Sequence, residues 1–98
     1  MTINKTLTGT ELAVALEGRL DTTTSPELEA SLNESLDGVT ALTFDFAKLD
    51  YISSAGLRVL LSAQKRMNKQ GDMKVVNVGE TIMEIFEVTG FSDILTIE

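Results

Sequence analysis

Two adjacent serines, Ser53 and Ser54, stand where an apolar segment gives way to a stretch with helical periodicity. The residues from Tyr51 to Leu60 read Tyr-Ile-Ser-Ser-Ala-Gly-Leu-Arg-Val-Leu. A helix that begins there places the hydroxyls beside unpaired backbone N–H groups and the positive end of the helix dipole. This position suits a negative group, which is either a bound anion or a phosphate carried by the serine itself.

A serine at the start of a helix is also an ordinary N-cap, whose oxygen accepts a hydrogen bond from an early helical N–H. Such a cap stabilises a helix by about 1 kcal/mol. Gly56 adds a second signal, because glycine in a first turn costs up to about 1 kcal/mol of helix propensity and leaves the backbone uncovered. The glycine therefore indicates that some group approaches the start of the helix closely, and spacing alone leaves the cap and the functional hydroxyl both open.

The chain contains no histidine and no cysteine. It therefore cannot build a Ser-His-Asp or Cys-His arrangement, nor an ordinary zinc site. The serine turn lacks the first glycine of a G-x-S-x-G nucleophile elbow, and no G-x-x-x-x-G-K-[ST] loop occurs. A metal would need carboxylates alone, and Asp21, Asp45 and Asp50 are better read as solvated strand-end groups. We expect no enzyme, no metal and no cofactor.

The charge balance bears on the choice of partner. Fifteen acidic residues against eight basic ones leave a net charge of −7, which repels nucleic acid backbones and anionic lipid. We therefore expect neither nucleic acid binding nor direct membrane binding. The clustered bases read as the solvated last turns of a helix, where they oppose its dipole: Lys65, Arg66 and Lys69.

The length of 98 residues and a hydrophobic content of 43% predict one compact domain, residues 1–98, with one core. No stretch approaches the roughly 20 apolar residues of a membrane helix. The N-terminal segment lacks the pattern of a secretory signal. Together with the absence of cysteine, these features favour a cytoplasmic setting.

Hydrophobic periodicity predicts the elements that position the serines. Residues 3–7 and 12–20 form a hairpin around Gly9, followed by a polar loop at 21–25. Pro26 opens a helix capped by Thr24 or Ser25, with a buried leucine stripe at 28, 32 and 36. A strand at 42–46, a helix at 55–70, a strand at 74–78, a helix at 80–88 and a short last strand at 94–97 follow.

The predicted order is ββαβαβα with a possible final β. It implies an α/β fold with a small mixed, mostly parallel sheet, an antiparallel N-terminal hairpin and flanking helices. Functional loops of such sheets gather beyond the carboxyl ends of the strands. We therefore expect Asp21 and the Ser53–Ser54 turn to lie on the same rim.

Four segments resemble known sequence blocks in the same order: Gly-Arg-Leu-Asp at 18–21, Leu-Thr-Phe-Asp-Phe at 42–46, Ile-Ser-Ser-Ala-Gly-Leu-Arg-Val-Leu-Leu at 52–61 and Phe-Glu-Val-Thr-Gly-Phe at 86–91. They are similar to those of the STAS domain proteins, in particular the stand-alone bacterial anti-sigma factor antagonists. The resemblance covers nearly the whole chain and implies the same α/β fold.

The resemblance also implies a function. The unmodified antagonist binds an anti-sigma factor that is a serine kinase and frees the sigma factor, and phosphorylation of one serine ends the binding. That serine aligns with Ser54. The family often carries aspartate just before it, where this chain has Ser53, so Ser53 is the alternative phosphorylation site. The implied partner-binding residues are Asp21, Ser53, Ser54, Ala55, Gly56 and Arg58.

Two alternatives remain open at this stage. Some STAS domains are non-phosphorylated scaffolds or regulatory subunits, including one in a bacterial lipid-transport complex. In that case Ser54 is only a cap, and an apolar patch on a helix contacts the partner. An enzyme or small-ligand binder is the remaining alternative, and the absent catalytic residues argue against it.

Overall fold

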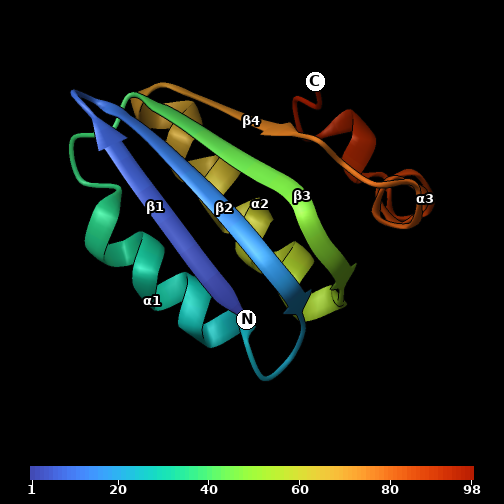
Figure 1. Ribbon diagram of the computed structural model, residues 1–98. Helices are drawn as coiled ribbons and strands as arrows, with labels where there is room; N and C mark the ends of the chain where they lie inside the picture. The colour runs from blue at the N-terminus through green and yellow to red at the C-terminus, as the bar shows by residue number, and fades with distance from the viewer.

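The computed structural model describes all residues, 1–98, and confirms the α/β class (Figure 1). Its sheet has four strands, adjacent in chain order: β1 (Thr2–Thr8), β2 (Glu11–Leu20), β3 (Ala41–Ile52) and β4 (Asp72–Val76). β1 pairs antiparallel with β2, and the remaining pairs are parallel, as the sequence predicts. The helices are α1 (Ser25–Ser35), α2 (Ser54–Gln70) and α3 (Glu80–Thr89), followed by the 3-10 turn η1 (Phe91–Asp93).

The helices α1 and α2 lie on the same face of the sheet, because parallel strands added one after another by right-handed crossovers place their helices on one side. The alternating residues Leu12, Val14 and Leu16 of β2 are buried on that face. The leucine stripe of α1 is buried against them, as predicted, and so is the inner face of α2. The opposite face of the sheet carries the small and polar side chains.

The strand β3 is longer than the predicted 42–46, and β4 begins and ends two residues before the predicted 74–78. β4 pairs only with the first five residues of β3, and its last partner there is Asp45. Beyond that point β3 continues beside β2, with register shifts that break its alternating pattern. The sequence missed this half because Ala47 and Lys48 are both exposed, so no period of two is visible. On the side of β3 away from β2, α3 lies in place of β4 beyond Asp45, and Phe86 packs on Phe46 with ring centroids 6.4 Å apart.

The predicted cap of α1 is wrong. Thr24 occupies the N-cap position but makes no side-chain capping bond, and Ser25 is already helical. Both hydroxyls turn back to the preceding loop instead: that of Thr24 donates to the carbonyl oxygen of Arg19, and that of Ser25 donates to the carbonyl oxygen of Asp21. They therefore hold the loop rather than the free N–H groups of the helix.

The C-terminal segment differs from its prediction in one respect. Gly90 ends α3 in the left-handed conformation, with φ of 80°, as expected of a terminating glycine. The predicted strand at 94–97 is reduced to a single parallel bridge between Ile97 and Val75, preceded by η1. Leu95 is nevertheless buried, so this segment closes the core beside β4.

Candidate functional site

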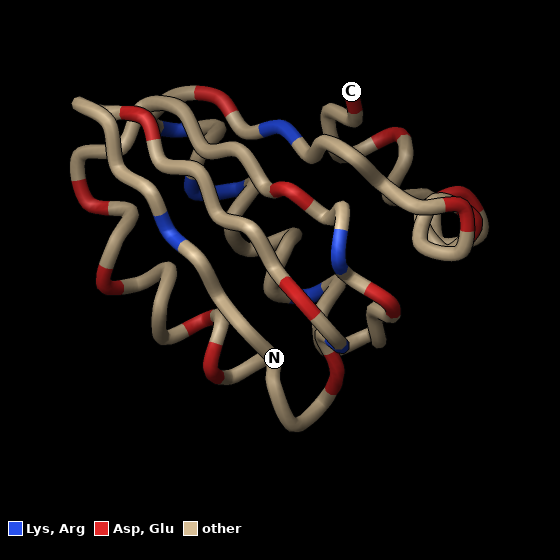
Figure 2. Tube along the Cα trace, in the orientation of Figure 1, with Lys and Arg blue, Asp and Glu red and all other residues tan.

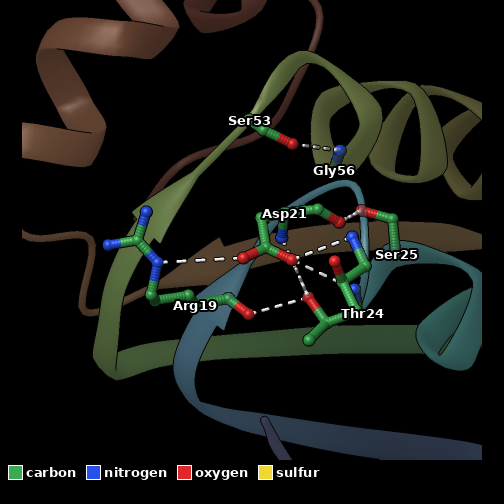
Figure 3. A network of polar contacts seen from close by, with 7 residues as sticks. Arg19, Asp21, Thr24, Ser25, Ser53 and Gly56 are labelled. Atoms are coloured by element: carbon green, nitrogen blue, oxygen red, sulfur yellow. Dashed lines mark hydrogen bonds and ion pairs between the residues drawn. The ribbon is translucent and has the colours of Figure 1, made fainter.

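The carboxyl ends of β2 and β3 meet at one rim, where both predicted functional loops lie (Figure 3). Leu20 and Ile52 are register partners at the ends of the two strands. The backbone N–H of Ser53 donates to the carbonyl oxygen of Leu20 at 2.9 Å. This bond brings the Asp21 loop and the start of α2 side by side, which confirms the predicted common rim.

The two serines take different positions at this rim. Ser53 is the N-cap of α2, with extended φ and ψ of −98° and 175°, and its oxygen accepts a hydrogen bond from the Gly56 N–H at 3.4 Å. Ser54 is the first helical residue, is exposed and makes no side-chain hydrogen bond. The capping role that the sequence allowed for either serine therefore falls to Ser53, and the hydroxyl of Ser54 is left accessible.

Gly56 is buried, so it does not itself offer a surface to a partner. A Cβ atom at this position would lie 2.7 Å from Cγ of Leu20 and 2.8 Å from Cγ1 of Ile52. The close approach that the glycine indicated is thus made by the ends of β2 and β3, not by an outside group. The sequence shows that a side chain is missing, but only the packing of α2 on the sheet shows which atoms use the space.

Asp21 shapes the loop between β2 and α1. Its Oδ1 atom accepts hydrogen bonds from the backbone N–H groups of Thr23 and Thr24, at 3.0 and 3.1 Å. These bonds, that of Thr24 first, hold the pKa of the Asp21 carboxyl below its usual value, and the Arg19 guanidinium adds to the effect. Asp21 makes no hydrogen bond to Ser53 or Ser54, although it lies on the same rim (Figure 3).

Arg19 completes this side of the rim, and the sequence did not single it out. Its Nε lies 3.8 Å from Oδ2 of Asp21, and its guanidinium stacks over the ring of Tyr51 at 4.5 Å from the centroid. Arg19 and Tyr51 are register partners on β2 and β3, so the stack also joins the strand ends. Only the bulged register of the two strands brings them opposite each other.

Ala55 and Arg58 face away from the sheet, toward a depression between α1 and α2. The depression has a volume of about 380 Å³. Its α2 wall consists of Ala55, Arg58, Val59 and Ser62, and its other wall of Thr22, Ser25, Pro26 and Glu29. Sequence patterns contain no signal for this second wall, since it depends on how the two helices pack.

Of the two other strand-end acidic residues, Asp45 lies apart from this rim and Asp50 lies close to it. Asp45 accepts hydrogen bonds from the Ala47 N–H at 2.9 Å and from the Asn77 amide at 3.0 Å, and in that order these lower the pKa of its carboxyl. Asp50 is exposed near the end of β3. No group of three or more acidic residues comes together in a way that could hold a metal ion. No helix has the length and apolar character needed to cross a membrane.

Comparison with known proteins identifies the family. Residues 2–98 match the model of the STAS domain. The chain belongs to the STAS domain family. BtrV of Bordetella bronchiseptica is 35% identical to it over 88 residues, which cover 88% of this chain and 76% of that protein. The anti-sigma-B factor antagonist of Bacillus subtilis is 29% identical over 88 residues, covering 89% and 81%.

Solved structures agree with the STAS fold of this chain. An anti-sigma factor antagonist from Mycobacterium paratuberculosis superposes with a TM-score of 0.88 at 23% identity, covering 98% of this chain and 83% of that one. The anti-sigma factor antagonist SpoIIAA in its unphosphorylated form gives 0.78 at 18% identity, covering 99% and 87%. SpoIIAA of Bacillus in its phosphorylated form gives 0.77 at 18% identity, covering 99% and 91%.

Proposed function

We propose that this STAS protein is an anti-sigma factor antagonist of the bacterial cytoplasm, controlled by phosphorylation of Ser54. Unmodified, it binds an anti-sigma factor that is also a serine kinase, and the sigma factor is released. Phosphate on Ser54 ends the binding. The observation that carries the proposal is the division of the serine pair, because Ser53 is used as a cap while the Ser54 hydroxyl is exposed and unpaired.

The relatives support this direction. Proteins named anti-sigma-B factor antagonist match most of the chain, and SpoIIAA has been solved in an unphosphorylated and a phosphorylated form. Both forms superpose on this fold with nearly equal TM-scores. This likeness supports a switch that acts at the surface of the domain.

The physical basis of the switch is local charge. A phosphate adds about −1.5 to −2 charges and three acceptor oxygens. Within the monomer, the start of α2 tolerates this charge because the helix dipole is positive there. In an interface the same charge must be desolvated and repels nearby carboxylates. A penalty of about 3 kcal/mol would weaken partner binding roughly a hundredfold.

The proposed contact surface surrounds Ser54. Ala55 and Arg58 continue it along the outer side of α2, while the Asp21 loop and the cap Ser53 border it on the sheet side. Gly56 contributes from below, by letting α2 sit close to the strand ends. The partner is thus expected to cover the first turns of α2 and the loop before α1.

The decisive experiment is incubation with ATP and the candidate anti-sigma factor kinases of the source organism, followed by mass spectrometry. We expect a single added phosphate on Ser54 in the wild type and in Ser53→Ala, and none in Ser54→Ala. Circular dichroism of each variant controls for folding. Phosphate found on Ser53, or no phosphate with any of these kinases, would contradict the proposal.

The second candidate function is a non-phosphorylated scaffold or regulatory subunit, and one observation favours it. Two large apolar side chains are exposed in the C-terminal segment: Val88 of α3 at 83% and Ile94, just after η1, at 46%. Residues 75–98 contain five acidic side chains and no basic one, so the segment that carries these two apolar side chains is acidic (Figure 2). If it were the main contact, Val88→Ser would abolish partner binding, and Ser54→Asp would leave it intact.

A further inference from the structure

We propose that Arg58 binds the phosphate of phosphorylated Ser54 on the surface of α2 and is thereby withdrawn from the partner. This inference rests on the proposed function, since it takes Ser54 as the phosphorylated residue. In the phosphorylated protein Arg58 holds the phosphate, and in the unphosphorylated protein it contacts the partner.

The first support is the spacing. Ser54 is the first residue of α2, and Arg58 lies four residues later on the same helix. Side chains at i and i+4 are neighbours on a helix surface, with Cβ atoms about 5–6 Å apart. Both side chains are exposed, so neither must leave a packed position for a phosphate and a guanidinium to meet. The length of the arginine side chain easily spans this separation.

The second support is that Arg58 has no partner in the unmodified protein. The three ion pairs of the structure join Arg19 to Asp21, Lys48 to Glu17 and Lys74 to Glu98. Arg58 makes neither an ion pair nor a side-chain hydrogen bond. Glu29 lies on the opposite wall of the same depression without forming an ion pair with it. The guanidinium is therefore available to a new anion.

Arg19 and Asp21, on the neighbouring strand and loop, are already engaged with each other. Arg19 is held between the Asp21 carboxylate and the Tyr51 ring, as Figure 3 shows for its approach to Asp21. Asp21 and the exposed Asp50, from the neighbouring loop and strand end, oppose a phosphate, although Arg19 partly balances Asp21. Arg58 is thus the one arginine at this rim that can turn to the phosphate, and its planar fork can donate two parallel hydrogen bonds.

This arrangement gives phosphorylation two effects at once. The phosphate adds negative charge at the proposed contact surface. It also draws Arg58 along the helix toward Ser54, so the depression between α1 and α2 loses its only basic side chain. A partner that offers an acidic group to Arg58 would lose that contact in the same step.

The composition of the chain makes the test unusually clean. With no histidine or cysteine, no side chain of ordinary pKa titrates between about pH 5 and 7, where the second ionisation of phosphoserine lies. We would install phosphoserine at position 54 during translation by genetic encoding, and follow its phosphorus NMR signal against pH. A bound guanidinium favours the dianion and lowers the phosphate pKa.

The expected results test whether the phosphate pKa depends on a positive charge at position 58 rather than on one farther along the helix. Arg58→Gln should raise the phosphate pKa by about 0.3 unit or more, as loss of an exposed i, i+4 ion pair implies. Arg58→Lys should restore most of the shift, and 1 M salt should reduce it. The control Lys65→Gln removes another exposed charge farther along α2 and should leave the pKa within about 0.1 unit. Equal phosphate pKa values in the wild type and Arg58→Gln would overturn the inference.

Failure of this inference is distinguishable from failure of the proposed function. Encoded phosphoserine needs no kinase, so the titration can be read even if no kinase modifies Ser54. Conversely, an unchanged pKa in Arg58→Gln removes the role of Arg58 but leaves phosphorylation of Ser54 as measured by mass spectrometry. Circular dichroism of the exposed Arg58 variants checks that each is folded.

Discussion

The Ser53 N–H donates a 2.9 Å hydrogen bond to the carbonyl oxygen of Leu20, which ties the start of α2 to the end of β2. Through this bond the sheet, rather than the loop itself, determines where Ser53 and Ser54 stand. Gly56 then lets the first turn of α2 approach the strand ends. The site is therefore built on rigid elements, and substitutions in it separate into those that change the fold and those that change only the surface.

Gly56→Ala should destabilise the protein. The added methyl would lie within 3 Å of both Leu20 and Ile52, and overpacking of this kind costs about 1–3 kcal/mol. The gain in helix propensity offsets up to about 1 kcal/mol, so we expect the free energy of unfolding in urea to fall by about 1–2 kcal/mol. Gly79→Ala adds a methyl where nothing lies within 4 Å of a Cβ, and since Gly79 is the N-cap of α3, we expect it to lower stability by less than about 1 kcal/mol. A Gly56→Ala protein as stable as wild type would show that the contact is not tight.

The two serines should differ in their effect on stability. Ser53→Ala removes the α2 cap and should lower the free energy of unfolding by about 0.5–1 kcal/mol, at the low end of cap values since the bond is long at 3.4 Å. Ser54→Ala removes an exposed hydroxyl without a partner and should change it by less than about 0.5 kcal/mol. Chemical denaturation measures both, and a larger loss in Ser54→Ala than in Ser53→Ala would contradict the assigned cap.

Stability should decline in acid partly through Asp21. Its folded pKa is lowered, first by the Thr24 N–H, so its contribution is fully present above the unfolded value of about 3.9 and is lost as the pH falls through the folded pKa. We expect Asp21→Asn to be less stable than wild type at pH 6, and the difference to shrink below about pH 4. Thermal unfolding at both pH values measures this. A stability difference between wild type and Asp21→Asn that grows in acid would contradict the predicted direction.

Asn77 offers a second test of local structure. Its φ of 57° is left-handed, and its amide donates to Asp45. Asn77→Gly loses the hydrogen bond but adopts this backbone freely, whereas Asn77→Ala also incurs about 1 kcal/mol for the left-handed conformation. Urea denaturation should therefore rank wild type above Asn77→Gly and Asn77→Gly above Asn77→Ala. In both variants the pKa of Asp45 should rise, as carboxyl NMR would show. Equal stability of the two variants would argue against the backbone cost.

Much of the fold was predictable because its signals are local. The hairpin around Gly9, the leucine stripe of α1 and the extents of α2 and α3 depend on periodicity and backbone preference within a few residues. The parallel neighbours and the common rim follow from connection rules, whereas the strand order β1-β2-β3-β4 was seen only in the structure. The Ser53–Ser54 turn could likewise be recognised from the sequence as the candidate functional site.

The predictions that failed depend on contacts between distant segments. The second half of β3 is a strand because β2 and α3 flank it, although its own residues do not alternate. Thr24 and Ser25 do not cap α1, because their hydroxyls donate to the carbonyl oxygens of Arg19 and Asp21 in the segment before the helix.

By itself the sequence determined the α/β fold class, the element order and the serine pair at the start of a helix, because each depends on patterns among neighbouring residues. Only the tertiary structure decided that Ser53 caps while Ser54 is exposed, that Gly56 makes room for Leu20 and Ile52, and that Arg58 has no partner. The reason is physical. Capping geometry, close packing and ion pairing depend on which atoms of remote segments arrive within a few ångströms, and spacing along the chain does not contain that information.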